Sequence, residues 1–173
     1  MESLSYKLLD LFVLQQQELT FAPVSSSELT DAIVPMMKQN LAAKDVMLSM
    51  HLAPATLYGD KDLLLSLLIN LIDNARKASS SGDTITVLGY SDNDYYCISV
   101  QDTGKGIPAD EIDKITKPFY MVDKSRSRKE GGAGLGMSLC YEILRLHHAQ
   151  WQIESELHVG TTITITIPQT GKE

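Results

Sequence analysis

The chain has 173 residues, 43% of them hydrophobic, and is long enough to bury about two-thirds of its unfolded surface in one ordinary domain. Its formal net charge is −7, which gives no sign of the clustered basic face that nucleic-acid binding usually needs. The charge therefore argues against DNA or RNA as a partner. Because no run of about 18 apolar residues and no signal peptide is visible, we expect a cytoplasmic piece without a membrane segment, whether or not the full-length protein is membrane-anchored.

The first elements are helices on either side of a short linker. Residues 2–18 carry leucines at helical spacing and predict the end of a helix that is attached to something else. Pro23 and the run of three serines that begins at Ser25 mark a linker, which we place at residues 19–26. A second helix is predicted from Ser27 to about Ala43, and Pro35 inside it must kink the helix or shift its start.

The later elements alternate between strands and helices. Together they predict an α/β two-layer sandwich, in which about three helices cover one face of a mixed, mostly antiparallel sheet. In chain order they are a strand over 46–53, a long helix over 60–79, a hairpin over 84–90 and 95–101, a short acidic helix, a glycine-bearing loop, a helix over 136–148, and a closing strand pair over 151–157 and 161–168 that turns at Gly160.

The stretch "DTGKGIP", residues 102–108, follows the second hairpin strand. That strand delivers Asp102 to the end of the sheet, where a carboxylate can accept hydrogen bonds from an amine in an apolar pocket. Gly104 and Gly106 let the backbone turn so that a flat ligand or another backbone can come close. Taken alone, the stretch is more typical of a plain turn than of a ligand pocket.

The helix "LLINLIDNARKAS" carries three polar residues on one otherwise apolar face. Asn70 and Asn74 are four residues apart, and Lys77 follows three later. The asparagines can simply satisfy backbone groups or face solvent. Alternatively, an amide oxygen can serve Mg²⁺, a hard cation that takes few protein oxygens, while the lysine meets a phosphate as a point charge.

The third motif is "GGAGLGMSL", residues 131–139, where four glycines lead into a helix. Free N–H groups at such a helix start can face an anion, so the segment is a phosphate-loop candidate, with a flexible turn as the alternative. It is not a Walker A loop, because Met137 stands where lysine is required. It is not the dinucleotide fingerprint either, because no strand precedes it and the glycine spacing differs.

The order and spacing of these motifs, with the Phe-Tyr pair between the second and third, resemble the catalytic ATP-binding domain of sensor histidine kinases. The superfamily also holds gyrase, Hsp90 and MutL, and the resemblance covers about residues 25–168. It implies an α/β sandwich that binds ATP with Mg²⁺ under a mobile lid, with Asn74 as the metal ligand. The implied ATP-site residues are Asn70, Asn74, Lys77, Asp102, Gly104, Gly106, Ile107, Phe119, Tyr120, Gly132, Gly134, Leu135, Gly136 and Thr162.

The segment between Phe119 and Gly131 is charged and long for a compact domain. Such a run is typical of a solvated loop, but basic side chains over an anionic ligand also suit a lid, which we favour. The family often has an arginine after its Phe-Tyr pair, where this chain has Met121. We therefore expect Arg126 to take the phosphate contact.

The resemblance implies a kinase that transfers the γ-phosphoryl group of ATP to a histidine on a dimerisation domain, for relay to an aspartate of a response regulator. ATP-hydrolysing relatives carry a glutamate general base where this chain has Asn70, so slow hydrolysis is expected. The family's acceptor histidine is followed by an acidic residue, whereas the residues after the four histidines are Leu, His, Ala and Val. These histidines are expected to be packing or surface residues: His51, His147, His148 and His158.

The implied organisation is the end of a dimerisation helix over 1–18, the linker over 19–26, the catalytic domain over 27–168 and a tail over 169–173. Two other functions stay open at this stage. One is a protein-serine kinase of the anti-sigma type, against which Asn70 and the N-terminal helix count. The other is a non-catalytic module that binds nucleotide or a partner, which Met121 supports.

Overall fold

The computed structural model describes residues 18–117, 120 and 136–169. The predicted helix over 2–18 and the predicted lid lie almost entirely outside these ranges. The described elements are β1 (Phe21–Ser25), α2 (Ser26–Ala42), β2 (Met47–Leu52), β3 (Thr56–Asp60), α3 (Lys61–Ala78), β4 (Thr84–Asp92), β5 (Tyr95–Asp102), a 3₁₀ turn η1 (Ile112–Lys114), α5 (Gly136–Leu146), β6 (Gln150–Glu156) and β7 (Gly160–Pro168).

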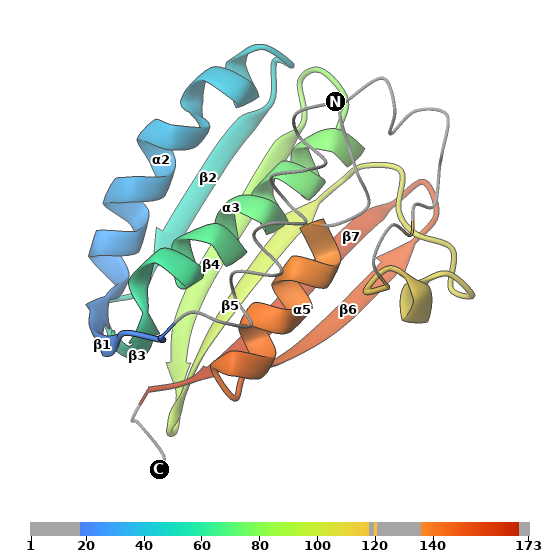
Figure 1. The fold of residues 1–173 in the computed structure, drawn as a ribbon. Helices are drawn as coiled ribbons and strands as arrows, with labels where there is room; N and C mark the ends of the chain where they lie inside the picture. Colours follow the sequence, from blue (N-terminus) through green and yellow to red (C-terminus); the bar gives the residue numbers. More distant parts are fainter. Residues whose placement is uncertain (1–17, 118–119, 121–135, 170–173) are drawn as a thin grey trace.

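The main sheet has five strands in the order β2-β4-β5-β7-β6. Strands β2 and β4 run parallel, and the other three pairings are antiparallel. Helices α2, α3 and α5 lie side by side on one face of this sheet (Figure 1). The predicted two-layer sandwich with a mostly antiparallel sheet is therefore confirmed.

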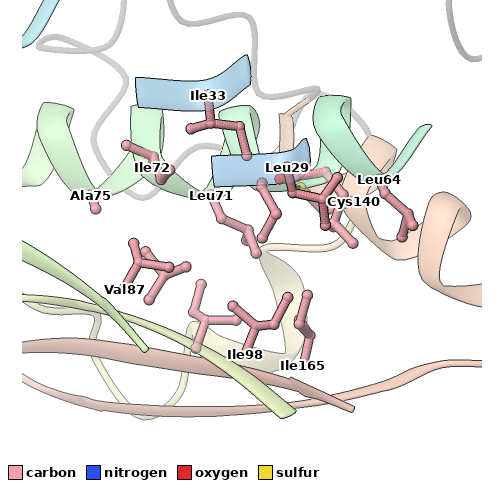
Figure 2. Close-up of a cluster of buried hydrophobic side chains, with 14 of the residues drawn as sticks. Leu29, Ile33, Leu64, Leu71, Ile72, Ala75, Val87, Ile98, Cys140 and Ile165 are labelled. Carbon is pink, nitrogen blue, oxygen red and sulfur yellow. Dashed lines mark hydrogen bonds between the residues drawn. The ribbon is translucent and has the colours of Figure 1, made fainter. Parts of the chain in front are cut away.

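The core fills the space between the helices and the sheet. Alternate residues of β5, among them Ile98, point toward the helices and are buried, because successive side chains of a strand face opposite sides. Figure 2 shows Leu29 from α2, Leu71 from α3 and Cys140 from α5 meeting the strand residues in one apolar cluster. Both helices that carry predicted site residues, α3 and α5, are thereby fixed to the sheet.

Helix α2 begins at Ser26, one residue before the predicted start. Ser25 caps it: the Ser25 hydroxyl accepts from the Glu28 N–H at 3.2 Å, and the Glu28 carboxylate accepts from the Ser25 N–H at 2.9 Å. Pro35 lies within the helix on its exposed side and does not end it.

The predicted linker over 19–26 contains a strand that the sequence did not indicate. β1 pairs antiparallel with β3 in a separate two-stranded sheet, with Phe21 opposite Asp60. Both strands have only five residues, so neither shows a long alternating pattern. Within the described ranges, no helix has the length and apolar character that crossing a membrane requires.

Candidate functional site

Asp102 ends β5 and is 7% exposed. Its Oδ1 accepts a hydrogen bond from the Gly104 N–H at 2.8 Å, and the Thr161 backbone also donates to the carboxylate. Burial raises the pKa of Asp102 above its usual value, and the charge of Asp83 adds to this, whereas the two backbone hydrogen bonds act in the opposite direction. The structure thus places the Asp102 carboxylate, a hydrogen-bond acceptor, in a buried position at the end of the sheet, where the sequence predicts it.

The two glycines after Asp102 allow close approach of backbone to backbone. A Cβ at Gly104 would overlap the carbonyl oxygen of Ala78 at the end of α3, and one at Gly106 would overlap the carbonyl oxygen of Glu156 at the end of β6. Gly106 also has φ +71°, which disfavours any side chain. Of the two reasons predicted for these glycines, the structure shows the close approach of another backbone.

Ser155 ties this loop to the β6–β7 turn. Its hydroxyl accepts from the Ile107 N–H at 2.7 Å, donates to the Gly160 carbonyl at 3.0 Å and lies 2.8 Å from Thr161 Oγ1. Ile107 therefore contributes its backbone to the loop's anchor. Ser155 was not among the predicted site residues, since a lone serine in a strand carries no distinctive signal.

Thr162 was the predicted site residue, but the structure places Thr161 beside Asp102. Thr161 pairs with Asp102 across the β5–β7 ladder, is 7% exposed and lies on the same face of the sheet as the core. Thr162 pairs with Gln101, and its side chain points to the opposite face because strand side chains alternate. Thr161 accordingly replaces Thr162 as the candidate residue.

The side-chain amides of Asn70 and Asn74 both face the start of α5. The Nδ2 group of Asn70 donates to the Ser66 carbonyl at 2.8 Å, and that of Asn74 donates to the thioether of Met137. A Cβ built on Gly136 would lie 3.4 Å from Asn70 Oδ1 and 3.6 Å from Asn74 Oδ1. Two neutral oxygens facing one helix start fit a hard cation that shares phosphate oxygens.

Lys77 lies on the same helix, but its ammonium group contacts the carboxylate of Asp73, which was not a predicted site residue. Lys77 Nζ is 2.9 Å from Asp73 Oδ2, and Arg76 Nη2 is 2.9 Å from Asp73 Oδ1. Burial acts to raise the pKa of Asp73, but the hydrogen bonds and charges of Lys77 and Arg76 outweigh it and lower that pKa. The i,i+4 spacing of Asp73 and Lys77 was the available signal for this pair.

Some predicted residues lie apart from this group. Tyr120 is half-buried, and its N–H donates to the Lys117 carbonyl at 3.1 Å. A pocket between α5 and β6 contains no predicted site residue and is lined by Tyr141, Leu144, Arg145, Ala149, Gln150 and Trp151. The predicted residues that lie outside the described ranges are Phe119, Arg126, Gly132, Gly134 and Leu135.

The described site residues all fall within a segment that matches a known protein family. Residues 59–171 match the family described as histidine kinase-, DNA gyrase B-, and HSP90-like ATPase. The chain belongs to this family. As a member of this ATPase family it is an ATP-binding domain, and Asn70, Asn74, Asp102 and Gly136 lie in the matched segment.

Relatives of the histidine kinase branch are similar to the chain. The adaptive-response sensory kinase SasA of Synechococcus elongatus is 40% identical over 114 residues, which cover 65% of this chain and 29% of that protein. The histidine kinase AdeS of Acinetobacter baumannii shares the fold with a TM-score of 0.80 at 20% identity, covering 98% of this chain and 79% of that one. Full-length ShkA in complex with AMPPNP gives a TM-score of 0.82 at 23% identity, covering 99% of this chain and 36% of that one.

The likeness to these kinases covers a part of each. The chain spans 18% to 36% of the length of the curated sensor kinases that it matches. Within that part, the family match and the fold agree on the ATP-binding domain.

Proposed function

We propose that this chain is the catalytic domain of a two-component sensor histidine kinase. It holds MgATP and presents the γ-phosphoryl group to a histidine on a dimerisation domain, and a response regulator's aspartate then receives the group. The cytoplasm is the proposed place of this reaction. One arrangement carries the proposal. The loop of the buried acceptor Asp102 packs on the end of α3, and the same helix carries the amide oxygens of Asn70 and Asn74.

The nucleotide would lie along α3. The loop of Asp102 packs on Ala78, the last residue of α3, and Asn70 lies eight residues earlier, which is about 12 Å along a helix. The adenine end therefore falls at Asp102 and the phosphate end at the start of α5. At the adenine end, the Asp102 carboxylate would accept a hydrogen bond from the exocyclic amine of adenine. A base with a carbonyl at that position has no hydrogen to donate there, so the site would favour adenine.

At the phosphate end, the proposed ligand of Mg²⁺ is Asn74 Oδ1, with Asn70 Oδ1 beside it. A bound Mg²⁺ would neutralise phosphate charge. The chain's own contribution is to hold these oxygens, because Ser66 and Met137 accept from the amide nitrogens and leave both oxygens facing Gly136. The Lys77 ammonium group already forms an ion pair with the Asp73 carboxylate. We therefore propose that Lys77 acts near the phosphates only as one member of that ion pair.

The transfer itself needs positioning more than protein chemistry. In the proposed step, a bond forms between an imidazole nitrogen of the acceptor and the γ-phosphorus, the bond from that phosphorus to the β,γ-bridging oxygen breaks, and ADP leaves. Asn70 cannot accept a proton as a glutamate could, which favours transfer over hydrolysis. The four histidines are poor phosphoryl acceptors. His147 is buried and uses both ring nitrogens in hydrogen bonds. The other three lack an acidic residue after them, since Leu, Ala and Val follow His51, His148 and His158, and the last two of these also lie in turns.

The test is a calorimetric titration with ATP, with and without Mg²⁺. We expect Asp102→Ala to abolish binding and Asn74→Ala to remove the Mg²⁺-dependent part of it. The exposed residues Asp94 and Asn40 supply matched controls, and Asp94→Ala and Asn40→Ala should bind as the wild type does. No ATP binding by a folded wild type at millimolar concentration contradicts the proposal.

A second step distinguishes the kinase from its alternatives. The wild-type chain with MgATP should phosphorylate a separately supplied histidine dimerisation domain, and the product should be acid-labile phosphohistidine. Phosphoserine on a partner would instead favour the serine kinase. ATP binding without transfer to any supplied histidine domain would favour a non-catalytic module.

A further inference from the structure

His147 directly follows α5 and is 4% exposed. Its Nδ1 lies 2.8 Å from the Ile143 carbonyl, which can only accept, so Nδ1 carries the proton. Its Nε2 accepts from the Asp60 N–H at 3.0 Å. The ring is therefore neutral and uses both nitrogens, one on its own helix and one on the end of β3.

The His147 ring also packs against the small β1–β3 sheet. The Phe21 ring of β1 stacks on it with centroids 4.8 Å apart and an interplanar angle of 20°. On β3, a Cβ at Gly59 would lie 2.8 Å from His147 Cδ2, so a glycine is needed for the ring to come this close. The end of α5 is thus attached to both short strands.

Asp60 joins the same point to the start of α3. Its Oδ2 accepts from the Thr20 N–H at 3.0 Å, and its Oδ1 accepts from the Leu63 N–H at 3.2 Å as the N-cap of α3. Its own N–H is the group that His147 accepts. The segment that leads into β1, the start of α3 and the end of α5 therefore meet at one buried pair of residues.

Both helices held at this junction carry the ATP site elsewhere along their length. Asn70 and Asn74 lie further along α3, and Gly136 begins α5, which is about 16 Å long for its 11 residues. We propose that His147 is a positioning residue that couples β1 to the ATP site by fixing α5 against α3. This proposal rests on the proposed function.

Coupling of this kind is reciprocal: if the junction sets the affinity for MgATP, then MgATP must alter the surroundings of His147. Electrostatic attraction alone is a weak route, because the length of α5, about 16 Å or two Debye lengths at physiological salt, separates the junction from the proposed phosphate end. The charged or titratable groups that act on His147 are Asp60 and His148.

The test compares variants of the 173-residue chain in MgATP titrations. His147→Phe keeps an aromatic ring for the stack but can neither accept from the Asp60 N–H nor donate to the Ile143 carbonyl, and we expect at least about fivefold weaker binding. His147→Gln keeps an acceptor and should recover part of the loss. Phe21→Ala leaves both hydrogen bonds and should weaken binding in the same direction. His51→Phe, at an exposed position of β2, should bind as the wild type does.

The spectroscopic readout is the imidazole NMR signal of His147 in the wild type, which should shift on addition of MgATP while that of His51 stays in place. The coupling is overturned if His147→Phe and Phe21→Ala both bind MgATP with wild-type affinity. If His147→Phe does not fold, wild-type affinity in Phe21→Ala alone overturns it. An NMR signal of His147 that does not shift on addition of MgATP overturns it as well. Failure of the wild type to bind MgATP would overturn the proposed function as well and is thereby distinguished.

Discussion

The Lys77 ammonium and the Arg76 guanidinium both contact the Asp73 carboxylate at 2.9 Å, on the helix that also carries Asn70 and Asn74. The three side chains are 19% to 24% exposed, so solvent screens them only in part. The lowered pKa of Asp73 means that the folded state binds a proton less readily than the unfolded state does. The two ion pairs therefore stabilise the fold above about pH 4 and lose this effect as the pH falls through the folded-state pKa of Asp73.

Asp73→Asn should accordingly lower the free energy of unfolding by about 1 kcal/mol at pH 7 and weaken the acid-induced loss of stability. Urea unfolding at several pH values between about 2 and 6, a range of roughly ±2 about the usual Asp pKa, measures both effects. Asp31→Asn on the exposed side of α2 is the control. Equal acid sensitivity of the wild type and Asp73→Asn would show that the ion pairs of Asp73 do not contribute to the free energy of unfolding.

Thr161 and Thr162 give a matched pair of substitutions on one strand. Thr161→Val should weaken ATP binding about fivefold or more, since it removes a hydroxyl beside the buried Asp102. Thr162→Val changes the other face of the sheet and should leave the affinity unchanged. Calorimetric titration of both variants decides, and the reverse order of effects would restore the prediction made from the sequence.

Gly106→Ala should destabilise the domain by more than about 3 kcal/mol, because the new methyl group would overlap the Glu156 carbonyl and the backbone has positive φ. Gly82 supplies the control, with φ +87° but nothing near its Cβ position. Gly82→Ala should cost only about 1 kcal/mol, the cost of the backbone conformation alone. Urea unfolding measures the difference, and equal costs would mean that the loop can move away from β6.

His147 should make the stability of the domain sensitive to mild acid. Burial lowers its pKa below 6.5, and His148 adds to this, while the contacts with Ile143 and Asp60 act in the opposite direction. The folded state therefore disfavours the proton, so stability is full above about pH 6.5 and falls as the pH drops below it. Thermal unfolding between about pH 5 and pH 8 should show this slope in the wild type and a flatter one in His147→Phe.

Asn70→Glu should raise ATP hydrolysis, because a carboxylate at this position can accept a proton from water near the start of α5. An increase of about 100-fold is at the low end for a positioned general base. Phosphate release in the presence of Mg²⁺ measures the rate. Asn70→Gln, which keeps the amide, should stay slow, and an equal rise in both variants would point to loosened structure instead of base catalysis.

Patterns that repeat along the chain were predictable. The β4–β5 hairpin and the helix with Asn70 and Asn74 each show several turns or alternations of one period, and the structure has them near the predicted bounds. Short elements were not predictable, since β1 and β3 have five residues each and are interrupted by Pro23 and Gly59. Their pairing depends on contacts between residues 31 to 39 apart in the sequence, which no local pattern encodes.

The site was predictable by residue type more than by orientation. Asp102, Asn70 and Asn74 could be chosen because a polar residue on an apolar element needs a reason. The choice between Thr161 and Thr162 depends on the register of β7 against β5, and a shift of one residue exchanges the faces. The engagement of Lys77 by Asp73 was encoded in their spacing and was overlooked.

The position of β7 in the sheet has a consequence for synthesis of the protein. β7 lies between β5 and β6, and its residue Thr161 pairs with Asp102, about 60 residues earlier in the chain. A nascent chain that has exposed everything up to β6 still lacks the strand that joins the two parts of the sheet. The domain can therefore complete its sheet and the adenine end of its site only after β7 has left the ribosome, and until then the β4–β5 hairpin presents an unpaired edge to chaperones or to aggregation.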